Sequence, residues 1–397
     1  MTSSRGARLV AGLGAVVLAA VVLLLARGGS LTVGGRRPVQ ATVSVTEALG
    51  GGDLSGFARA SGPRPFSFPA DHGPHPEFRT EWWYYTGNLG AAEGRRFGFQ
   101  LTFFRTALAP HAAERGSRWA ATQVYLAHFA LTDVAGARFR AFSRTSRGAL
   151  GLAGAQAEPF RVWLEDWVAE VDEPLQVQRG AGALPMRLRA AEGDVAIDLR
   201  LESAKPVVLQ GVGGWSRKGP EPGNSSYYYS LTRMHGRGAI RVGGEQFSVD
   251  GLAWMDREWS TSALGQDLAG WDWFALQLAG GRELMFYQLR RKDGTADRFS
   301  AGALIEVDGA TRLLGLEDVK LEVLGSWVSP RSGVRYPAGW RLVLPAQGLV
   351  LEATPLLADQ ELIVGTRYWE GAVEVRGTDS GRSVDGRGYV ELVGYGG

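Results

Sequence analysis

The sequence predicts an all-β protein with two antiparallel β-barrels in tandem, preceded by an apolar N-terminal segment. From about residue 66 onward, short runs rich in Trp, Tyr, Phe and Val alternate between apolar and polar positions, which is the period of a strand. Glycine, at 56 residues, is about twice as frequent as usual and recurs in pairs between the runs, as expected for turns. Few stretches after residue 30 have a helical period, so we expect little helix.

The composition limits the class of protein and its partners. With 397 residues, of which 45% are hydrophobic, the chain is long enough for about two domains with sizeable cores. The formal net charge of +2 is too balanced to indicate a nucleic-acid partner or an electrostatic attachment to a membrane surface. The absence of cysteine excludes disulfides, cysteine-ligated metal sites and a thiol nucleophile.

The first 30 residues have the pattern of an export signal or a single membrane anchor. Arg5 and Arg8 precede an uncharged apolar run of eighteen residues, from Leu9 to Ala26. No clear A-x-A site follows, so the segment either is cleaved or stays as an anchor that contacts the membrane. In both cases we expect the rest of the chain to be exported to a periplasmic or other extracytoplasmic location. Residues 31–59 are predicted to be a linker.

Residues 60–215 are predicted to form the N-terminal barrel. The stretch 157–171 is ambiguous between strand and helix, and we favour strand. The other runs with clear alternation in this half are Glu81–Leu89, Phe97–Phe104, Gln123–Thr132 and Val195–Leu201.

Residues 216–397 are predicted to form the C-terminal barrel. The segment 211–224, rich in Gly and Pro, is the most linker-like interior stretch and is taken as the domain boundary. About ten strands over roughly 170 residues suit a closed barrel, which leaves no exposed edge. The predicted strands are Tyr227–Met234, Gln246–Trp254, Trp271–Leu278, Glu283–Arg290, Ala303–Val307, Val319–Val323, Trp340–Leu344, Leu349–Ala353, Ala372–Arg376 and Tyr389–Leu392.

Carboxylates and tryptophans are concentrated between residues 251 and 278, where four of the thirteen tryptophans occur. If both ends of this stretch are strands, Trp254, Asp256 and Glu258 share one face, and Asp272 shares its face with core residues. A carboxylate surrounded by aromatic rings loses hydration, which raises its pKa and allows it to donate a proton near neutral pH. The alternative is that Arg257 or another arginine neutralises these acids in structural ion pairs.

Two further aromatic runs predict either sheet packing or a lined cavity. Alternation places Trp83 and Tyr85 on one face of the first run, and Tyr227, Tyr229 and Arg233 on one face of the second. Aromatic side chains favour strands and fill barrel interiors, which is the packing interpretation. Under the functional interpretation, these rings line a site for an extended hydrophobic ligand.

Familiar hydrolytic and nucleotide-binding motifs do not occur in the sequence. There is no G-x-S-x-G elbow, H-E-x-x-H helix, Walker loop or Rossmann fingerprint. His72, His75 and Glu77 form an H-x-x-H-x-E run that could hold a metal, but the neighbouring glycine and prolines indicate a loop without a second ligand cluster. We therefore predict no metal site.

Several short motifs occur in a fixed order from about residue 60 to the C-terminus, and they carry a family resemblance. They are E-W-W-Y-Y-T-G-N-L at Glu81–Leu89, A-H-F-A-L-T-D at Ala127–Asp133, S-Y-Y-Y-S-L-T-R at Ser226–Arg233, G-L-A-W-M-D-R-E-W at Gly251–Trp259, G-W-D-W-F-A-L-Q-L at Gly270–Leu278, D-Q-E-L at Asp359–Leu362, Y-W-E-G at Tyr368–Gly371 and G-R-G-Y-V-E-L at Gly386–Leu392. With them the chain resembles the family that joins the carotenoid 1,2-hydratases (hydroxyneurosporene synthases) to the AttH proteins, which have two lipocalin-like barrels.

The resemblance implies more than one function, and hydration is the first. A hydratase would add water across a trisubstituted alkene without a cofactor, which requires a neutral acid, aromatic faces to stabilise a cation, and a polar group to orient water. The candidate acids are Asp256 and Asp272, with Glu258 beside them. The candidates that position water or line the site are Tyr227, Tyr229, His235, Trp83, Tyr85, Trp254, Trp259, Trp271 and Trp273.

The other implied function is binding without turnover. Exported members of the family resemble accessory proteins of ABC transporters, so the partner would be a transporter permease and the ligand a lipid, an isoprenoid or a lipoprotein segment. In that case Asp256, Arg257, Glu258 and Arg233 would tie the two domains together. An uncharacterised secreted hydrolase is a third possibility.

Overall fold

The computed structural model describes residues 54–110, 121–172, 185–262 and 265–396. Helix in these ranges is confined to four short 3-10 turns, η1 (Ala70–His72), η2 (Ala92–Gly94), η3 (Leu316–Asp318) and η4 (Pro345–Gln347). None of the helices in the described ranges has the length and apolarity needed to span a membrane. The all-β prediction is confirmed, whereas the predicted export segment and nearly all of the linker lie outside the described residues.

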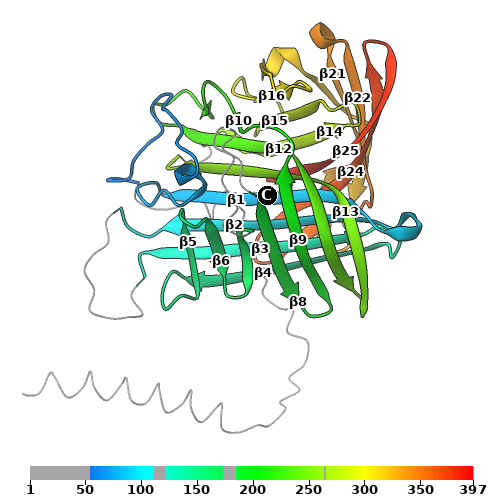
Figure 1. Cartoon of the computed structure of the whole chain (residues 1–397). Helices are drawn as coiled ribbons and strands as arrows, with labels where there is room; N and C mark the ends of the chain where they lie inside the picture. The colour runs from blue at the N-terminus through cyan, green and yellow to red at the C-terminus, as the bar shows by residue number, and fades with distance from the viewer. Residues whose placement is uncertain (1–53, 111–120, 173–184, 263–264, 397) are drawn as a thin grey trace, which may run out of the picture. The chain divides into compact units, whose positions relative to one another are not determined.

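The first sheet is a nearly closed barrel of thirteen strands within the described chain (Figure 1). Its main path runs β4-β3-β2-β1-β13-β12-β9-β8-β7-β6-β5, with β10 and β11 paired to β12, and β4 approaches β6 across the gap. The strands are β1 (Thr80–Gly90), β2 (Arg96–Ala107), β3 (Gln123–Asp133), β4 (Arg138–Arg147), β5 (Ala153–Gln156), β6 (Arg161–Leu164), β7 (Trp167–Val171), β8 (Met186–Glu192), β9 (Val195–Ser203), β10 (Val208–Leu209), β11 (Trp215–Arg217), β12 (Ser225–Val242) and β13 (Glu245–Ser260).

The second sheet is a half-barrel of ten strands within the described chain. Its path runs β17-β16-β15-β14-β25-β24-β22-β21-β18, with β23 paired to β24, while β19 and β20 form a separate ladder. The strands are β14 (Leu268–Leu278), β15 (Glu283–Arg291), β16 (Ala301–Ile305), β17 (Thr311–Gly315), β18 (Lys320–Val323), β19 (Ser326–Val328), β20 (Arg335–Pro337), β21 (Trp340–Leu344), β22 (Leu349–Pro355), β23 (Glu361–Ile363), β24 (Arg367–Asp379) and β25 (Arg382–Val393). The closed C-terminal barrel that we predicted is therefore open, because β17 and β18 do not pair with each other in the described chain.

Every predicted strand overlaps a strand of the structure. The ambiguous stretch 157–171 forms β6, a turn and β7, as favoured from the sequence. The two sheets correspond to two lipocalin-like barrels, so the predicted fold class is confirmed.

The strand pairing divides the chain later than the predicted boundary at residues 215 and 216. Both β12 and β13 pair within the first sheet, so the change to the second sheet falls between Ser260 and Leu268. The segment 211–224 is rich in Gly and Pro, like a linker, but the reason is that its backbone turns tightly against the first barrel. Gly214, for example, has φ +86°, and a Cβ there would lie 2.2 Å from the Phe66 ring.

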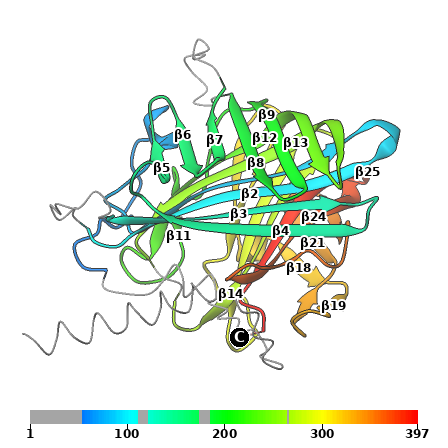
Figure 2. The ribbon, with the colours of Figure 1, turned by 90° about the horizontal axis from the view of Figure 1, so that it is seen from below.

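Several strands near the second sheet are buried on both faces. On β1, Trp83 and Tyr85 pack into the core of the first barrel, whereas Tyr84 belongs to a separate apolar cluster between the sheets. There β24 and β25 of the second sheet lie beside β1 and β2, as Figure 2 also shows. The approach is close, since a Cβ at Gly98 would lie 2.6 Å from that of Ala372. This contact region holds the candidate site.

Candidate functional site

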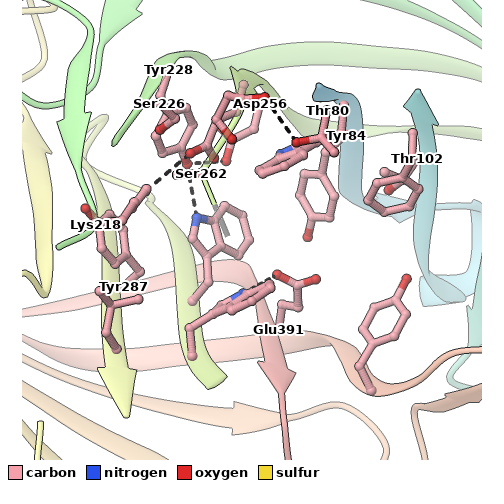
Figure 3. Close-up of a pocket in the computed structure, with 18 of the residues that line it drawn as sticks. Thr80, Tyr84, Thr102, Lys218, Ser226, Tyr228, Asp256, Ser262, Tyr287 and Glu391 are labelled. Atoms are coloured by element: carbon pink, nitrogen blue, oxygen red, sulfur yellow. Dashed lines mark hydrogen bonds and ion pairs between the residues drawn. The ribbon is translucent and has the colours of Figure 1, made fainter. Parts of the chain in front are cut away.

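A cavity of about 150 Å³ lies between the two sheets (Figure 3). Its walls combine aromatic rings with carboxyl groups and hydroxyls, and both sheets contribute. The lining side chains are Thr80, Trp82, Tyr84, Gln100, Thr102, Phe104, Lys218, Ser226, Tyr228, Asp256, Glu258, Ser260, Ser262, Trp271, Trp273, Tyr287, Leu289, Tyr368 and Glu391.

Strand register builds the first wall in rows across β1, β13 and β12. Asp256 on β13 pairs with Tyr84 of β1 on one side and with Ser230 of β12 on the other. Two residues further along β13, Glu258 pairs with Trp82 and Tyr228 in the same way. Because side chains two apart on a strand share a face, the rows place both carboxyl groups on the cavity wall.

The second wall comes from β14, β15 and β25. Trp271 and Trp273 lie two residues apart on the same face of β14, and both line the cavity. Trp273 pairs with Tyr287 on β15 and with Glu391 on β25. Figure 3 shows Glu391 on the side of the cavity that faces Asp256 and Tyr228. The cavity thus has two carboxyl groups from the first sheet, Asp256 and Glu258, and one from the second sheet, Glu391.

Asp256 is a buried carboxyl, 4% exposed, that accepts hydrogen bonds from three side chains. The donors are the Tyr228 hydroxyl (2.5 Å), the Ser230 hydroxyl (2.5 Å) and the Trp254 indole N–H (2.7 Å). Burial raises the pKa of Asp256 to about 7, against an ordinary value of 3.8, even though the three donors favour the carboxylate. Asp256 therefore changes its protonation state near neutral pH.

We expect Ser230→Ala to raise the pKa of Asp256 above 7, because it removes a donor that stabilises the carboxylate. Titration of isotope-labelled aspartate carboxyl signals by NMR measures this change. Ser203→Ala, whose hydroxyl instead donates to the Lys205 carbonyl oxygen, should leave the titration unchanged. An unchanged or lowered pKa in Ser230→Ala would show that this hydroxyl does not control the acid.

Glu391 is the second acid of the cavity. It accepts the indole N–H of Trp271 at 2.9 Å. Burial, together with the negative charges of Asp256 and Glu258, raises its pKa from 4.5 to about 7, although the hydrogen bond from Trp271 favours the carboxylate. Since the two acids influence each other, they titrate as a coupled pair near pH 7.

Lys218 compensates the charge of Glu258, the third carboxylate that lines the cavity. Its Nζ lies 3.4 Å from a Glu258 oxygen and 3.9 Å from the centre of the Tyr287 ring. Although burial alone would lower the pKa of Lys218, the carboxylate of Glu258 and the Tyr287 hydroxyl raise it above its ordinary value. Lys218 and Glu258 thus form an ion pair, which leaves Asp256 and Glu391 as the titrating acids.

A fourth acid, Glu370, lies behind the cavity wall. It is fully buried, accepts the Tyr84 hydroxyl at 2.5 Å, and pairs with Glu391 across β24 and β25. Burial and the neighbouring Glu391 carboxylate raise the pKa of Glu370 well above its ordinary value, which favours the neutral form of this group.

The raised acid pKa values predict that stability falls as the pH rises. The folded-state pKa of Glu391 lies above its unfolded value, so its contribution is complete below about pH 4.5 and is lost as the pH rises through 7. Glu391→Gln removes this loss. In urea unfolding at a series of pH values, we expect the variant to gain about 1–3 kcal/mol relative to the unmodified protein between about pH 5 and pH 8. Parallel pH profiles of the two proteins would contradict this expectation.

Asp272, predicted as a catalytic acid, lies on the opposite face of β14 from the cavity. It shares that face with Phe274, as the alternation predicted, and is 2% exposed. It accepts hydrogen bonds from Arg290 (2.8 Å) and from the Tyr395 hydroxyl (3.0 Å). Burial raises the pKa of Asp272, but its environment is an ion pair in the second barrel, away from the cavity lining.

Five of the predicted ligand-binding rings pack into the core of the first barrel. These rings contact the η1 loop and the barrel interior: the indole of Trp83 donates to the His72 carbonyl oxygen at 2.8 Å. The alternate side chains of the same strands line the cavity instead. The five rings are Trp83, Tyr85, Tyr227, Tyr229 and Trp259.

The remaining predicted residues have three different positions. Trp254 lies behind the cavity wall as a donor to Asp256, and Trp271 and Trp273 line the cavity. Arg233 pairs with Glu283 of the second sheet, so it ties the sheets together. His235 is exposed on β12, outside the cavity lining.

The two histidines of the H-x-x-H-x-E run belong to a polar network around η1, whereas Glu77 is exposed. His72 Nδ1 lies 2.6 Å from the Tyr229 hydroxyl, and His75 Nε2 lies 3.0 Å from Asp71. Within the described part of the chain, no three histidine or acidic side chains converge in a way that could hold a metal.

Our sequence reasoning missed several lining residues, of which Glu391 matters most. An acid between Val390 and Leu392 in a strongly apolar strand was the available signal, and the G-R-G-Y-V-E-L motif contains it. Lys218 lies in the presumed linker, where no periodicity indicates its position. The other missed side chains with polar groups in the lining are Thr80, Tyr84, Gln100, Thr102, Ser226, Tyr228, Ser260, Ser262, Tyr287 and Tyr368.

Comparisons with known structures agree with this fold. A crystal structure of a protein assigned to AttH from Nitrosomonas europaea is similar over 85% of this chain and 100% of its own, with 36% identity and a TM-score of 0.74. Kievitone hydratase from Nectria haematococca matches 85% of this chain and 98% of its own at 15% identity, with a TM-score of 0.63. CghA in complex with Sch210972 matches 86% and 97% at 18% identity, with a TM-score of 0.52. At these low identities the last two share the fold.

The sequence comparisons identify the family. A search among curated proteins found no match. The model of the AttH-like family matches residues 59–395, which include every strand described above. The chain therefore belongs to the AttH-like family.

Proposed function

We propose that this protein catalyses the addition of water to a carbon–carbon double bond of an apolar ligand, without a cofactor. The observation that carries the proposal is the pair of acids, Asp256 and Glu391, that face one aromatic cavity from different sheets with pKa values near 7. Alkene hydration requires one group that gives a proton and one that takes a proton, and this pair supplies both near neutral pH.

Simple binding of an apolar ligand does not explain the acids. A buried carboxyl group without a compensating charge destabilises the fold as soon as it ionises, and burial raises the pKa values of both Asp256 and Glu391 on the wall of this cavity. An apolar binding site would be more stable with aliphatic side chains at these positions. Groups that cost stability while facing a cavity are characteristic of catalytic sites.

The hydrogen bonds favour different roles for the two acids. Three donors stabilise the carboxylate of Asp256, whereas the Trp271 indole is the donor given to Glu391 in the described chain. We therefore assign Glu391 as the general acid and Asp256 as the general base. The proton of Glu391 adds to the less substituted alkene carbon, and a cation forms at the other carbon.

Water then attacks the cation and transfers its proton toward Asp256, so that one water adds and no other reactant is needed. The faces of Trp271, Trp273 and Tyr228 stabilise the cation. Ser226 lines the cavity, and its buried hydroxyl has no partner among the described residues, which makes it available to orient the water. Exchange with solvent returns the proton from Asp256 to Glu391.

The cavity volume limits the part of the ligand that reacts here. About 150 Å³ corresponds to a space that holds one benzene-sized group. A five-carbon unit with a double bond fits, whereas the extended hydrophobic ligand predicted from the sequence would place only its reactive end in this space. The name of kievitone hydratase is consistent with hydration chemistry on this fold.

Binding without turnover is the second candidate function, favoured by the aromatic lining and by the ties between the sheets. Glu283 joins Arg233 and Lys205 of the first-sheet region, with Lys205 Nζ at 2.7 Å, and this cluster is structural. Export of the chain, its contact with a membrane and its association with an ABC transporter permease stay predictions from the sequence.

The test is incubation of the purified protein with short trisubstituted alkenes in heavy-oxygen water. We expect alcohols that carry the heavy isotope, detected by mass spectrometry, and we expect Asp256→Asn and Glu391→Gln each to form them at least about 100-fold more slowly. Asp198→Asn, a matched change in an exposed ion pair with Arg187, should keep the activity. Retention of an alkene by the protein without any isotope incorporation would favour binding without turnover.

A further inference from the structure

One end of the cavity is polar but uncharged. Figure 3 shows Tyr84 and Thr102 on the opposite side of the cavity from Lys218 and Tyr287. Gln100 and Tyr368 also line the cavity, and both contact this group, since Gln100 Nε2 lies 2.6 Å from Thr102 Oγ1 and 3.5 Å from the Tyr368 hydroxyl. We call Gln100, Thr102 and Tyr368 the amide end of the cavity.

The Gln100 carbonyl oxygen is an acceptor without a donor. Gln100 is 1% exposed, and among the described residues no group donates to its Oε1. Its amide nitrogen donates hydrogen bonds to the hydroxyls of Thr102 and Tyr368. A buried acceptor that lacks a donor destabilises a protein, so its presence on a cavity wall indicates that a ligand supplies the donor.

The neighbours of Gln100 favour a neutral donor. The Tyr368 hydroxyl lies 2.7 Å from His128 Nδ1, and burial lowers the pKa of His128 to about 3, so the imidazole is neutral. Burial raises the pKa of Glu370, which accepts the Tyr84 hydroxyl, and so favours its neutral form as well. An ammonium group would find no carboxylate to compensate its charge here, whereas a hydroxyl needs none.

From this arrangement we infer that the ligand carries a hydroxyl group that donates a hydrogen bond to Gln100 at the amide end, while its double bond reaches the acids. The position of the double bond rests on the proposed function, but the recognition of the hydroxyl does not. The substrate class is then an amphipathic alcohol with a trisubstituted double bond. A pure hydrocarbon leaves the Gln100 oxygen unpaired, and an ether or ketone places a second acceptor against it.

Three probes that share one five-carbon skeleton with the same trisubstituted double bond test the inference: prenol, its methyl ether and the hydrocarbon 2-methyl-2-butene. Their binding to the purified protein is followed through the indole N–H signals of Trp271 and Trp273 in NMR spectra of protein with isotope-labelled tryptophan. We expect prenol to bind at least about tenfold more tightly than the ether and the hydrocarbon. Binding of the ether as tightly as prenol would overturn the inference, whatever the variants show.

Substitutions at the amide end test whether the preference for prenol arises there. Gln100→Leu should reduce the preference for prenol to less than about threefold, and Gln156→Leu, at an edge strand outside the cavity, should preserve it. Tyr368→Phe supplies a second measurement at the same end. A preference that survives in both Gln100→Leu and Tyr368→Phe would contradict the assignment of the amide end. Because binding is measured without turnover, failure of the proposed hydration leaves this result intact, and the reverse also holds.

Discussion

Glu391→Gln should reduce the hydration rate by about 100- to 10,000-fold while the protein stays folded, because the amide cannot deliver the proton that starts the reaction. The side chain keeps its size, and the Trp271 indole can still donate to the remaining carbonyl oxygen. The measurement is the initial rate of heavy-oxygen incorporation into a short trisubstituted alkene. The loss should be accompanied by disappearance of the limb of the pH profile near 7 that reports the acid.

A control variant makes this result specific. Glu352→Gln removes an exposed carboxylate of the second sheet that pairs with Arg341, and it should leave both rate and pH profile unchanged. If Glu391→Gln retains more than about a third of the rate, or loses rate without a change in the pH profile, Glu391 is not the general acid.

Glu81→Gln should cause the largest loss of stability among the changes considered, about 3–5 kcal/mol. The Glu81 carboxylate is fully buried and pairs with two fully buried guanidiniums, those of Arg105 and Arg257. Although burial alone would raise its pKa, the positive charges of Arg257 and Arg105 hold the pKa of Glu81 well below its ordinary value. A neutral amide leaves two buried positive charges without compensation.

Urea unfolding near neutral pH measures this loss, with Glu352→Gln as the matched control. Removal of that exposed ion pair should cost less than about 1 kcal/mol. A loss below about 1 kcal/mol for Glu81→Gln as well would mean that water or rearrangement compensates Arg105 and Arg257. Since the pKa of Glu81 is lowered in the fold, its contribution is present above about pH 4.5 and disappears as the pH falls.

Strand positions could be predicted from the sequence because alternation is a local property. The choice of partner strand is not local, and this explains the displaced boundary. Nothing in the period of β12 and β13 shows that they pair with β1 and β9 of the first sheet and not with β14. The Gly- and Pro-rich segment 211–224 resembled a linker, although β11 within it pairs to β12.

The candidate site was predictable only in part: Asp256 and Glu258 on the first wall, and Trp271 and Trp273 on the second. The motif around Asp256 and Glu258 indicated acids beside aromatic rings, and both line the cavity. Alternation showed that Trp83 and Tyr85 share a face, but β1 is buried on both faces, so hydrophobicity does not show which face meets the cavity. Glu391 comes from the other sheet and joins the site through the pairing of β25 with β14, which no local pattern reveals.

The central claim is that a carboxyl group in this cavity stays protonated close to neutral pH, and titration of Glu391 tests it most directly. The experiment is an NMR titration of isotope-labelled glutamate carboxyl signals in the intact protein, with Glu391→Gln used to assign the resonance. The structure predicts a midpoint of about 7 for Glu391. A midpoint near the ordinary glutamate value of 4.5 would show that the cavity hydrates its acids, and the hydration mechanism would then lack its proton donor.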